Sequence, residues 1–112
     1  MRVISQDGRI DVPYEMVAIQ EYKNAVYFLN RNLAGAEDID IKLAEYSTEE
    51  KAVKAMEMLR EQYKALEVLK VLANGTAEHM EKSFKLDEFA EYNRAYRDMN
   101  VFQFPQDDEI EV

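Results

Sequence analysis

The sequence predicts an α+β fold in which an antiparallel sheet of N-terminal hairpins, joined by a C-terminal strand, packs on a long helix. Three observations predict it: residues 1–46 are β-rich runs separated by turn residues, residues 47–99 carry helical spacing, and 100–105 are again β-rich. A chain of 112 residues suits a single domain, with 106–112 as its acidic tail.

The first β-rich run predicts a hairpin. Arg2–Ser5 and Arg9–Val12 flank Asp7-Gly8, a pair that favours the positive φ angles of a type I′ turn. Pro13 lacks an N–H, so we expect it to end the second strand.

A second hairpin follows, from Met16–Tyr22 and Ala25–Asn30 on either side of a Lys-Asn pair. Both faces of Ala25–Asn30 are largely apolar, which predicts a central position in the sheet. We expect residues 33–40 to form a loop and Ile41–Tyr46 a further strand.

The period then changes from strand to helix. Ser47 and Glu50 have the spacing of a capping box, so the sequence predicts a helix over Thr48–Ala73. One face of this helix carries apolar residues at spacings of three and four, namely Ala52, Met56, Leu59, Tyr63 and Leu66. We expect Leu59 to be the residue of this face whose removal destabilises the fold most.

A second helical segment completes an αα-hairpin. Asn74-Gly75-Thr76 offers a helix stop and a new N-cap, which predicts that the first helix ends here and that residues 77–99 form the second, with a break near Ser83–Asp87.

The end of the first helix is apolar around more than half of its circumference and must be covered from two sides. An aromatic stripe on the second helix could cover it within one chain, or the two together could form a homodimer interface. The predicted interface residues are Leu66, Leu69, Leu72, Phe89, Tyr92 and Tyr96.

The C-terminal run Val101–Phe104 predicts a short strand that Pro105 closes. We expect it to join the sheet of the N-terminal hairpin, which would tie both ends of the chain down, since chain ends otherwise tend to fray.

Composition excludes several classes of protein. The net charge is −9, and residues 74–112 carry ten acidic against four basic side chains, so direct nucleic-acid binding is disfavoured. The absence of cysteine excludes disulfides, zinc-thiolate sites and cysteine nucleophiles. We see neither an apolar run long enough to span a membrane nor a signal peptide, and expect a cytoplasmic protein without membrane association.

No motif predicts an enzyme, a cofactor or a metal site. His79 is the only histidine and is expected to be a surface or capping residue, and the acidic loop Glu37–Asp40 lacks the pattern of a calcium-binding loop. The acidic side chains near the C-terminus form a candidate acidic face, expected to be solvated: Asp107, Asp108, Glu109 and Glu111.

Four segments resemble small uncharacterised proteins encoded by prophages and mobile elements of Gram-positive bacteria. They are "MRVISQDG", "DVPYE", "YSTEEKAVKAMEMLR" and "FQFPQDDEIEV". The resemblance covers about residues 1–66 and 101–112 and implies a bacterial cytoplasmic setting, but no known chemistry.

The sequence therefore favours a non-enzymatic interaction or adaptor protein of a phage or mobile element that associates with itself. An acidic decoy that mimics DNA is the alternative, and it requires the acids of residues 78–111 to line one continuous face. A metal-dependent enzyme would require Asp107 and Asp108 to converge with Asp38 or Asp40.

Overall fold

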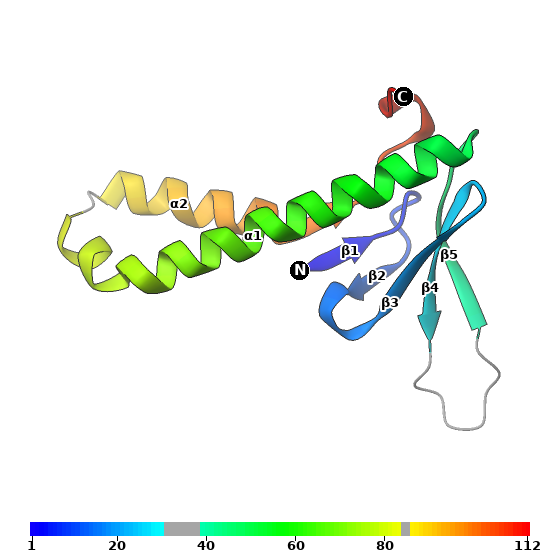
Figure 1. Ribbon diagram of the computed structural model, residues 1–112. Coiled ribbons are helices and arrows are strands. Elements are labelled where there is room, and N and C mark those ends of the chain that lie inside the picture. Colours follow the sequence, from blue (N-terminus) through cyan, green and yellow to red (C-terminus); the bar gives the residue numbers. More distant parts are fainter. Residues whose placement is uncertain (31–38, 84–85) are drawn as a thin grey trace.

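The computed structural model describes residues 1–30, 39–83 and 86–112, apart from the side chains of 30, 39, 72–83, 86–90 and 92. In chain order the elements are β1 (Arg2–Ile4), β2 (Asp11–Pro13), the 3₁₀ turn η1 (Tyr14–Met16), β3 (Ala18–Tyr22), β4 (Ala25–Asn30), β5 (Ile39–Glu45), α1 (Glu49–Ser83), α2 (Leu86–Met99), β6 (Val101–Gln103) and the 3₁₀ turn η2 (Asp107–Glu109). The α+β prediction is confirmed (Figure 1).

The strands form two sheets instead of the single sheet expected. One has the order β2-β1-β6 and the other β3-β4-β5. Pro13 and η1 separate β2 from β3, which explains the division: proline donates no hydrogen bond and the 3₁₀ turn redirects the chain.

Both ends of the chain do lie in one sheet, as predicted. Val3 of β1 lies opposite Val12 of β2 on one side and Phe102 of β6 on the other. The β1–β6 pairing is parallel, whereas an antiparallel sheet was expected. The chain leaves α2 beside its own start, where the Arg2 N–H donates to the Asn100 carbonyl at 2.9 Å, so β6 runs in the same direction as β1.

The turn of the first hairpin is not type I′, because Gly8 has a positive φ (77°) and Asp7 does not. The Gly8 N–H donates to the Ser5 carbonyl at 2.9 Å. The Asp7 carboxylate accepts from the Arg9 N–H at 3.0 Å, which stabilises a longer loop.

The second hairpin and its central strand are confirmed, although β3 begins at Ala18 and the expected first residue, Met16, lies in η1. Tyr22 and Ala25 close a two-residue turn in which Lys23 has a φ of 55°, and β4 lies between β3 and β5. The expected loop 33–40 is shortened by β5, which begins at Ile39; the rest of that loop lies outside the described residues.

The predicted helical face is buried: Ala52 and Leu59 have no exposed surface. The cap differs from the prediction, since the Thr48 hydroxyl accepts from the Lys51 N–H at 3.2 Å and Ser47 lies one residue before the cap. The predicted stop at Gly75 is wrong, because α1 continues to Ser83. Glycine costs a helix only about 1 kcal/mol relative to alanine, which need not end a helix held by neighbouring turns.

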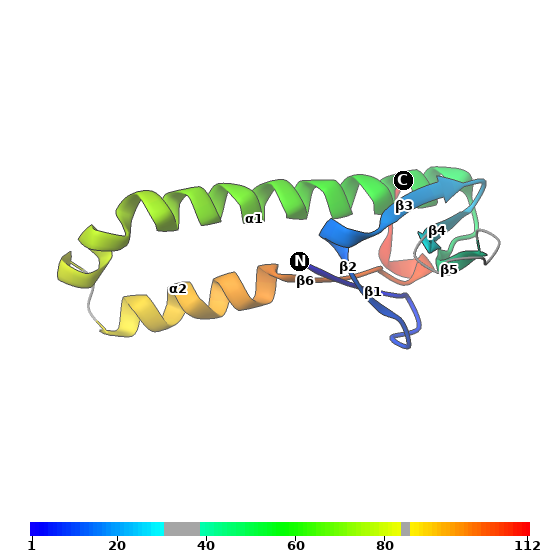
Figure 2. The same cartoon turned by 90° about the horizontal axis from the view of Figure 1, so that it is seen from below.

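The break expected near residues 83–87 is confirmed, and α2 returns along α1 as an αα-hairpin (Figure 2). The hairpin extends away from the sheets, and the molecule measures 52 × 39 × 21 Å.

One hydrophobic core joins both sheets to the first part of α1. It takes Val3 and Phe102 from the first sheet, Val26 and Phe28 from the second, and Leu59 from the helix. The core therefore fixes where α1 lies relative to both sheets, and hence which strand edges remain beside it.

Candidate functional site

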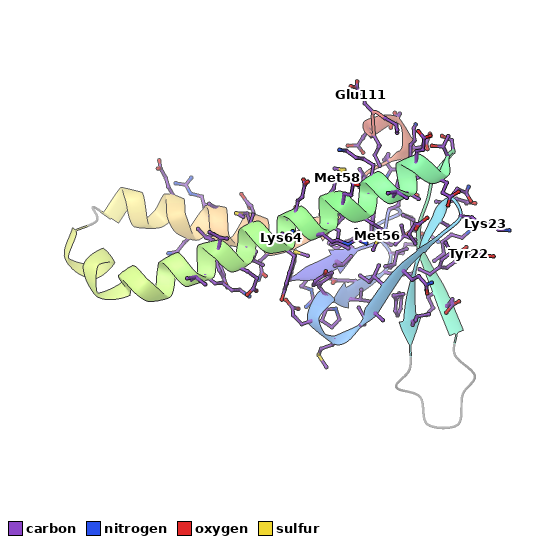
Figure 3. The ribbon with its side chains drawn as sticks, in the orientation of Figure 1. Tyr22, Lys23, Met56, Met58, Lys64 and Glu111 are labelled. Carbon is purple, nitrogen blue, oxygen red and sulfur yellow. The ribbon has the colours of Figure 1, made fainter. Side chains whose placement is uncertain are left out.

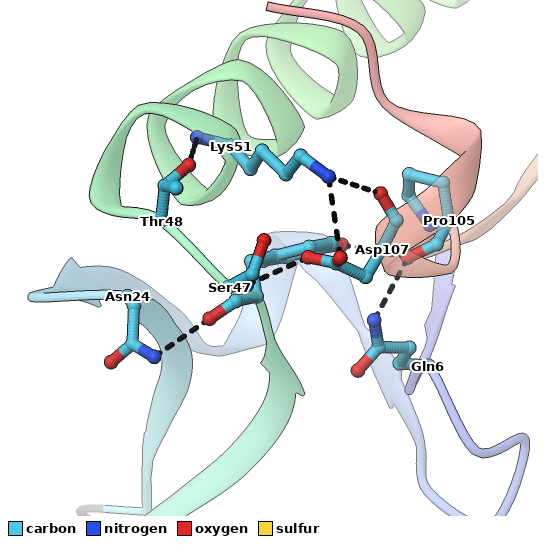
Figure 4. Close-up of polar contacts among 8 residues, drawn as sticks. Gln6, Asn24, Ser47, Thr48, Lys51, Pro105 and Asp107 are labelled. Atoms are coloured by element: carbon cyan, nitrogen blue, oxygen red, sulfur yellow. Dashed lines mark hydrogen bonds and ion pairs between the residues drawn. The ribbon is translucent and has the colours of Figure 1, made fainter.

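The C-terminal acidic residues do not form a free tail. The Asp107 carboxylate accepts from the Ser47 N–H at 2.7 Å and from Lys51 Nζ at 3.2 Å, and Lys51 also donates to the Asp107 carbonyl at 2.8 Å (Figure 4). The Ser47 N–H, more than the lysine, holds the pKa of Asp107 below its usual range. Ile110 is buried in the core, so residues 106–112 dock against the start of α1, while the Asp107 side chain remains partly exposed to solvent.

The other residues of the candidate acidic face have different surroundings. The Glu109 carboxylate accepts from the Gln106 N–H at 2.9 Å, while Asp108 and Glu111 are exposed. The acids of α2 and those of η2 lie toward opposite ends of α1 (Figure 1), which does not favour the continuous face that a DNA mimic needs.

The predicted dimer interface is only partly open to a partner. Leu66 has no exposed surface and Tyr96 packs against the core, so these two serve packing within the chain. Leu66 is thereby excluded from the interface. Leu69 is half-buried, and the side chains of Leu72, Phe89 and Tyr92 lie outside the described residues.

The remaining candidates form no catalytic or metal site in the described part of the chain. His79 lies within α1, not at the start of a second helix, and its side chain is outside the described set, as are Glu37 and Asp38. No three described His, Cys, Asp or Glu side chains are grouped so as to hold a metal ion.

The outer strands of the two sheets differ in how far other residues cover their outward backbone groups. β2 is short and contains Pro13, and β6 is covered by Gln62, whose Nε2 donates to the Val101 carbonyl at 2.7 Å and the Met99 carbonyl at 3.0 Å. Gln6 covers the last part of β5: its N–H donates to the Leu43 carbonyl at 2.8 Å and its side-chain carbonyl accepts from the Glu45 N–H at 3.0 Å.

Within the described part of the chain, the outer strand β3 has no such cover. Residues flanking a two-residue hairpin turn form a hydrogen-bonded pair, so Ala18, Gln20 and Tyr22 bond to β4. Ile19 and Glu21 therefore direct their N–H and C=O groups away from β4. No hydrogen bond to these groups is found within the described residues.

A groove of about 450 Å³ lies between this edge and α1. Figure 2 shows β3 next to α1, with β4 and β5 beyond it, and Figure 3 shows Met56 on the side of α1 that faces the strands. Five of the seven lining residues are apolar or aromatic, but more of the exposed lining surface is polar than apolar; the residues are Tyr14, Glu15, Val17, Ile19, Met56, Arg60 and Tyr63. Its volume falls in the range of ligand sites in proteins.

Two of the residues that line the groove are tyrosines whose rings pack against each other. The rings of Tyr14 and Tyr63 lie with centroids 4.5 Å apart, tilted by 45°. Burial raises the pKa of Tyr63, and the carboxylates of Glu67 and Glu15 raise it further, so this hydroxyl stays protonated and can donate.

The two charges of the groove are not equivalent. The Glu15 carboxylate accepts from the Met1 ammonium group at 2.6 Å, which holds the pKa of Glu15 below its usual range. Arg60 is exposed and has no ion pair among the described side chains. The groove therefore offers both polar and apolar surface, an unpaired strand edge and, among the described side chains, one positive charge without an ion pair.

Sequence reasoning assigned these residues to the fold and missed the groove. Met56 and Tyr63 were part of the predicted apolar face of the helix, and Ile19 part of a predicted strand. The alternation in Met16–Tyr22 identifies a strand, but nothing local identifies it as an outer one.

No protein-family profile matches the chain, and no curated protein or solved structure matches it. Within the described helices, none combines the length and the hydropathy that crossing a bilayer requires.

Proposed function

We propose that this protein is a non-enzymatic interaction module that binds an extended segment of a partner polypeptide along β3, in the groove under α1. The observation that carries the proposal is the uncovered edge of β3 beside a groove that exposes both polar and apolar surface. In β-strand addition, the backbone groups of an exposed edge bind a peptide backbone, and neighbouring pockets select alternate side chains.

The contrast with the other outer strands supports the proposal. Proteins generally protect strand edges, because an open edge pairs with other chains. Here Pro13, Gln62 and Gln6 each protect part of an edge, whereas no contact among the described residues covers the outward backbone groups of Ile19 and Glu21. A selective absence of protection is what a binding edge requires.

The position of α1 supports a single strand as the occupant. Two β3 strands that paired about a twofold axis would bring both α1 helices onto the same face of the joined sheet, over the same two strands. A single extended segment has no such requirement, and a groove between a strand and a helix accommodates it.

The test blocks the edge without changing the groove. Glu21→Pro removes one outward N–H but no bond to β4, and Glu21→Thr is the matched control that keeps the N–H. Random peptides displayed on phage are selected on the immobilised parent and then tested on both variants. We expect the enriched peptides to bind the parent and Glu21→Thr and to lose binding to Glu21→Pro.

Equal retention on Glu21→Pro would place binding elsewhere and overturn the proposal. A selection that enriches no peptide would count equally against it. Circular dichroism of both variants establishes that they are folded.

A further inference from the structure

We infer that the strand bound at β3 carries a carboxylate that faces α1 and pairs with Arg60, between apolar side chains on the same face. This inference rests on the proposed function and names the chemistry of its partner.

The pattern of the partner follows from strand geometry. In a strand added beside β3, every second side chain points to the face that α1 covers. On that face the added strand meets Val17 and Ile19 along the sheet and Met56 above it, all three lining the groove. Apolar side chains at alternate positions fill this surface.

The charge follows from the two ionic groups of the groove. The carboxylate of Glu15 already has the Met1 ammonium group at 2.6 Å, so it does not call for a cationic ligand. Arg60 lines the same groove without an ion pair among the described residues. A carboxylate matches the planar guanidinium with two parallel hydrogen bonds, which makes it the complementary group.

The overall charge of −9 makes this preference informative. Long-range attraction would favour basic peptides on such a protein. A preference for an acidic peptide would therefore have to arise from the local contact with Arg60.

The test uses synthetic peptides whose sequence reads the same in both directions, so that strand orientation does not matter. The parent peptide is acetyl-Thr-Thr-Val-Thr-Glu-Thr-Val-Thr-Thr-amide, and two matched peptides carry Gln or Lys at the centre. A further pair, Thr-Thr-Val-Thr-Val with a free or an amidated end, separates a side-chain carboxylate from a terminal one. Binding is measured by fluorescence anisotropy on the full chain.

We expect the Glu peptide to bind about three- to tenfold more tightly than the Gln peptide and the Lys peptide to bind most weakly, as for a partly exposed charge pair. Arg60→Glu should reverse the order of the Glu and Lys peptides, whereas Arg60→Lys should keep it. A free-acid preference confined to the short pair would assign the carboxylate to a chain end instead of a side chain.

Equal affinities for the three peptides, with binding still lost in Glu21→Pro, would overturn this inference and leave the proposed function standing. Binding that persists in Glu21→Pro would overturn the proposed function itself. Light scattering adds one more outcome: a parent that is a dimer, and that becomes a monomer in Glu21→Pro, would assign the edge to a second copy and overturn the peptide inference.

Discussion

The sheet β2-β1-β6 and the sheet β3-β4-β5 contribute to the same core but treat their outer strands differently. Pro13 and Gln62 each protect part of an edge of the first sheet, whereas in the second Gln6 covers the last part of β5, and β3 has no such cover among the described residues. The first sheet joins distant parts of the chain, and the second is built from neighbours in sequence. The comparison teaches that the outer strands β2, β6 and β5 are each partly protected, and that the unprotected strand, β3, is the one beside the groove under α1.

The largest effect on stability is expected from a substitution in the hydrophobic core that both sheets share. Leu59 of α1 has no exposed surface, and Leu59→Ala leaves a cavity in the common core, so we expect a loss of about 2–5 kcal/mol in the free energy of unfolding. Urea denaturation followed by circular dichroism measures it. Val68→Ala on the same helix, where the side chain is 60% exposed, should change stability by no more than about 0.5 kcal/mol. Equal effects at the two positions would show that the buried face of α1 is assigned wrongly.

A smaller effect is expected from uncovering an edge of the first sheet. Gln62→Leu keeps the size of the side chain but removes the donor to the Val101 and Met99 carbonyls, and we expect a loss of about 1 kcal/mol. The exposed neighbour Glu61→Ala is the matched control. If Gln62→Leu unfolds at the same urea concentration as the parent, Gln62 is not a structural cover and the contrast between the sheets weakens.

Next in size is the contact that holds the C-terminal segment to α1. The pKa of Asp107 is lower in the folded chain than in the unfolded one, so its ionised form stabilises the fold above the unfolded pKa. That contribution is lost as the pH falls through the folded pKa. Asp107→Asn should therefore be less stable than the parent at neutral pH, by less than Gln62→Leu because the group is partly exposed, and the two should converge in strong acid.

Thermal denaturation of the parent and Asp107→Asn across acidic and neutral pH measures this difference. Asp108→Asn, an exposed neighbour, should show little change at any pH. A difference between the parent and Asp107→Asn that stays constant into strong acid would mean that the carboxylate charge is not responsible.

Sequence patterns predicted the elements that depend on neighbouring residues. The turn at Lys23 and the apolar faces of β4 give the second hairpin and its central strand, and the spacing that includes Leu59 gives the buried face of α1. The failures came from distant contacts. Asp107 binds the Ser47 N–H from sixty positions along the chain, and no local signal indicates it.

The groove could not be predicted for the same reason. Whether β3 is an outer strand depends on where the first sheet ends, and whether Arg60 lies beside Ile19 depends on how α1 crosses the second sheet. The sequence predicts the strand and the helix separately, but packing in the core determines that the edge of β3 lies beside the side of α1 that carries Arg60.

The smallest expected effect on stability is at the open edge itself. Glu21 directs its N–H away from β4, so Glu21→Pro removes no hydrogen bond of the sheet and should change the free energy of unfolding by no more than about 0.5 kcal/mol relative to Glu21→Thr. Gln20→Pro, one residue away, removes an N–H that bonds to β4 and should cost several times more. Urea denaturation of the three variants tests the alternation directly. A cost at Glu21 equal to that at Gln20 would mean that the outward N–H of Glu21 already has a partner, in which case the edge of β3 is closed and offers no strand-binding site.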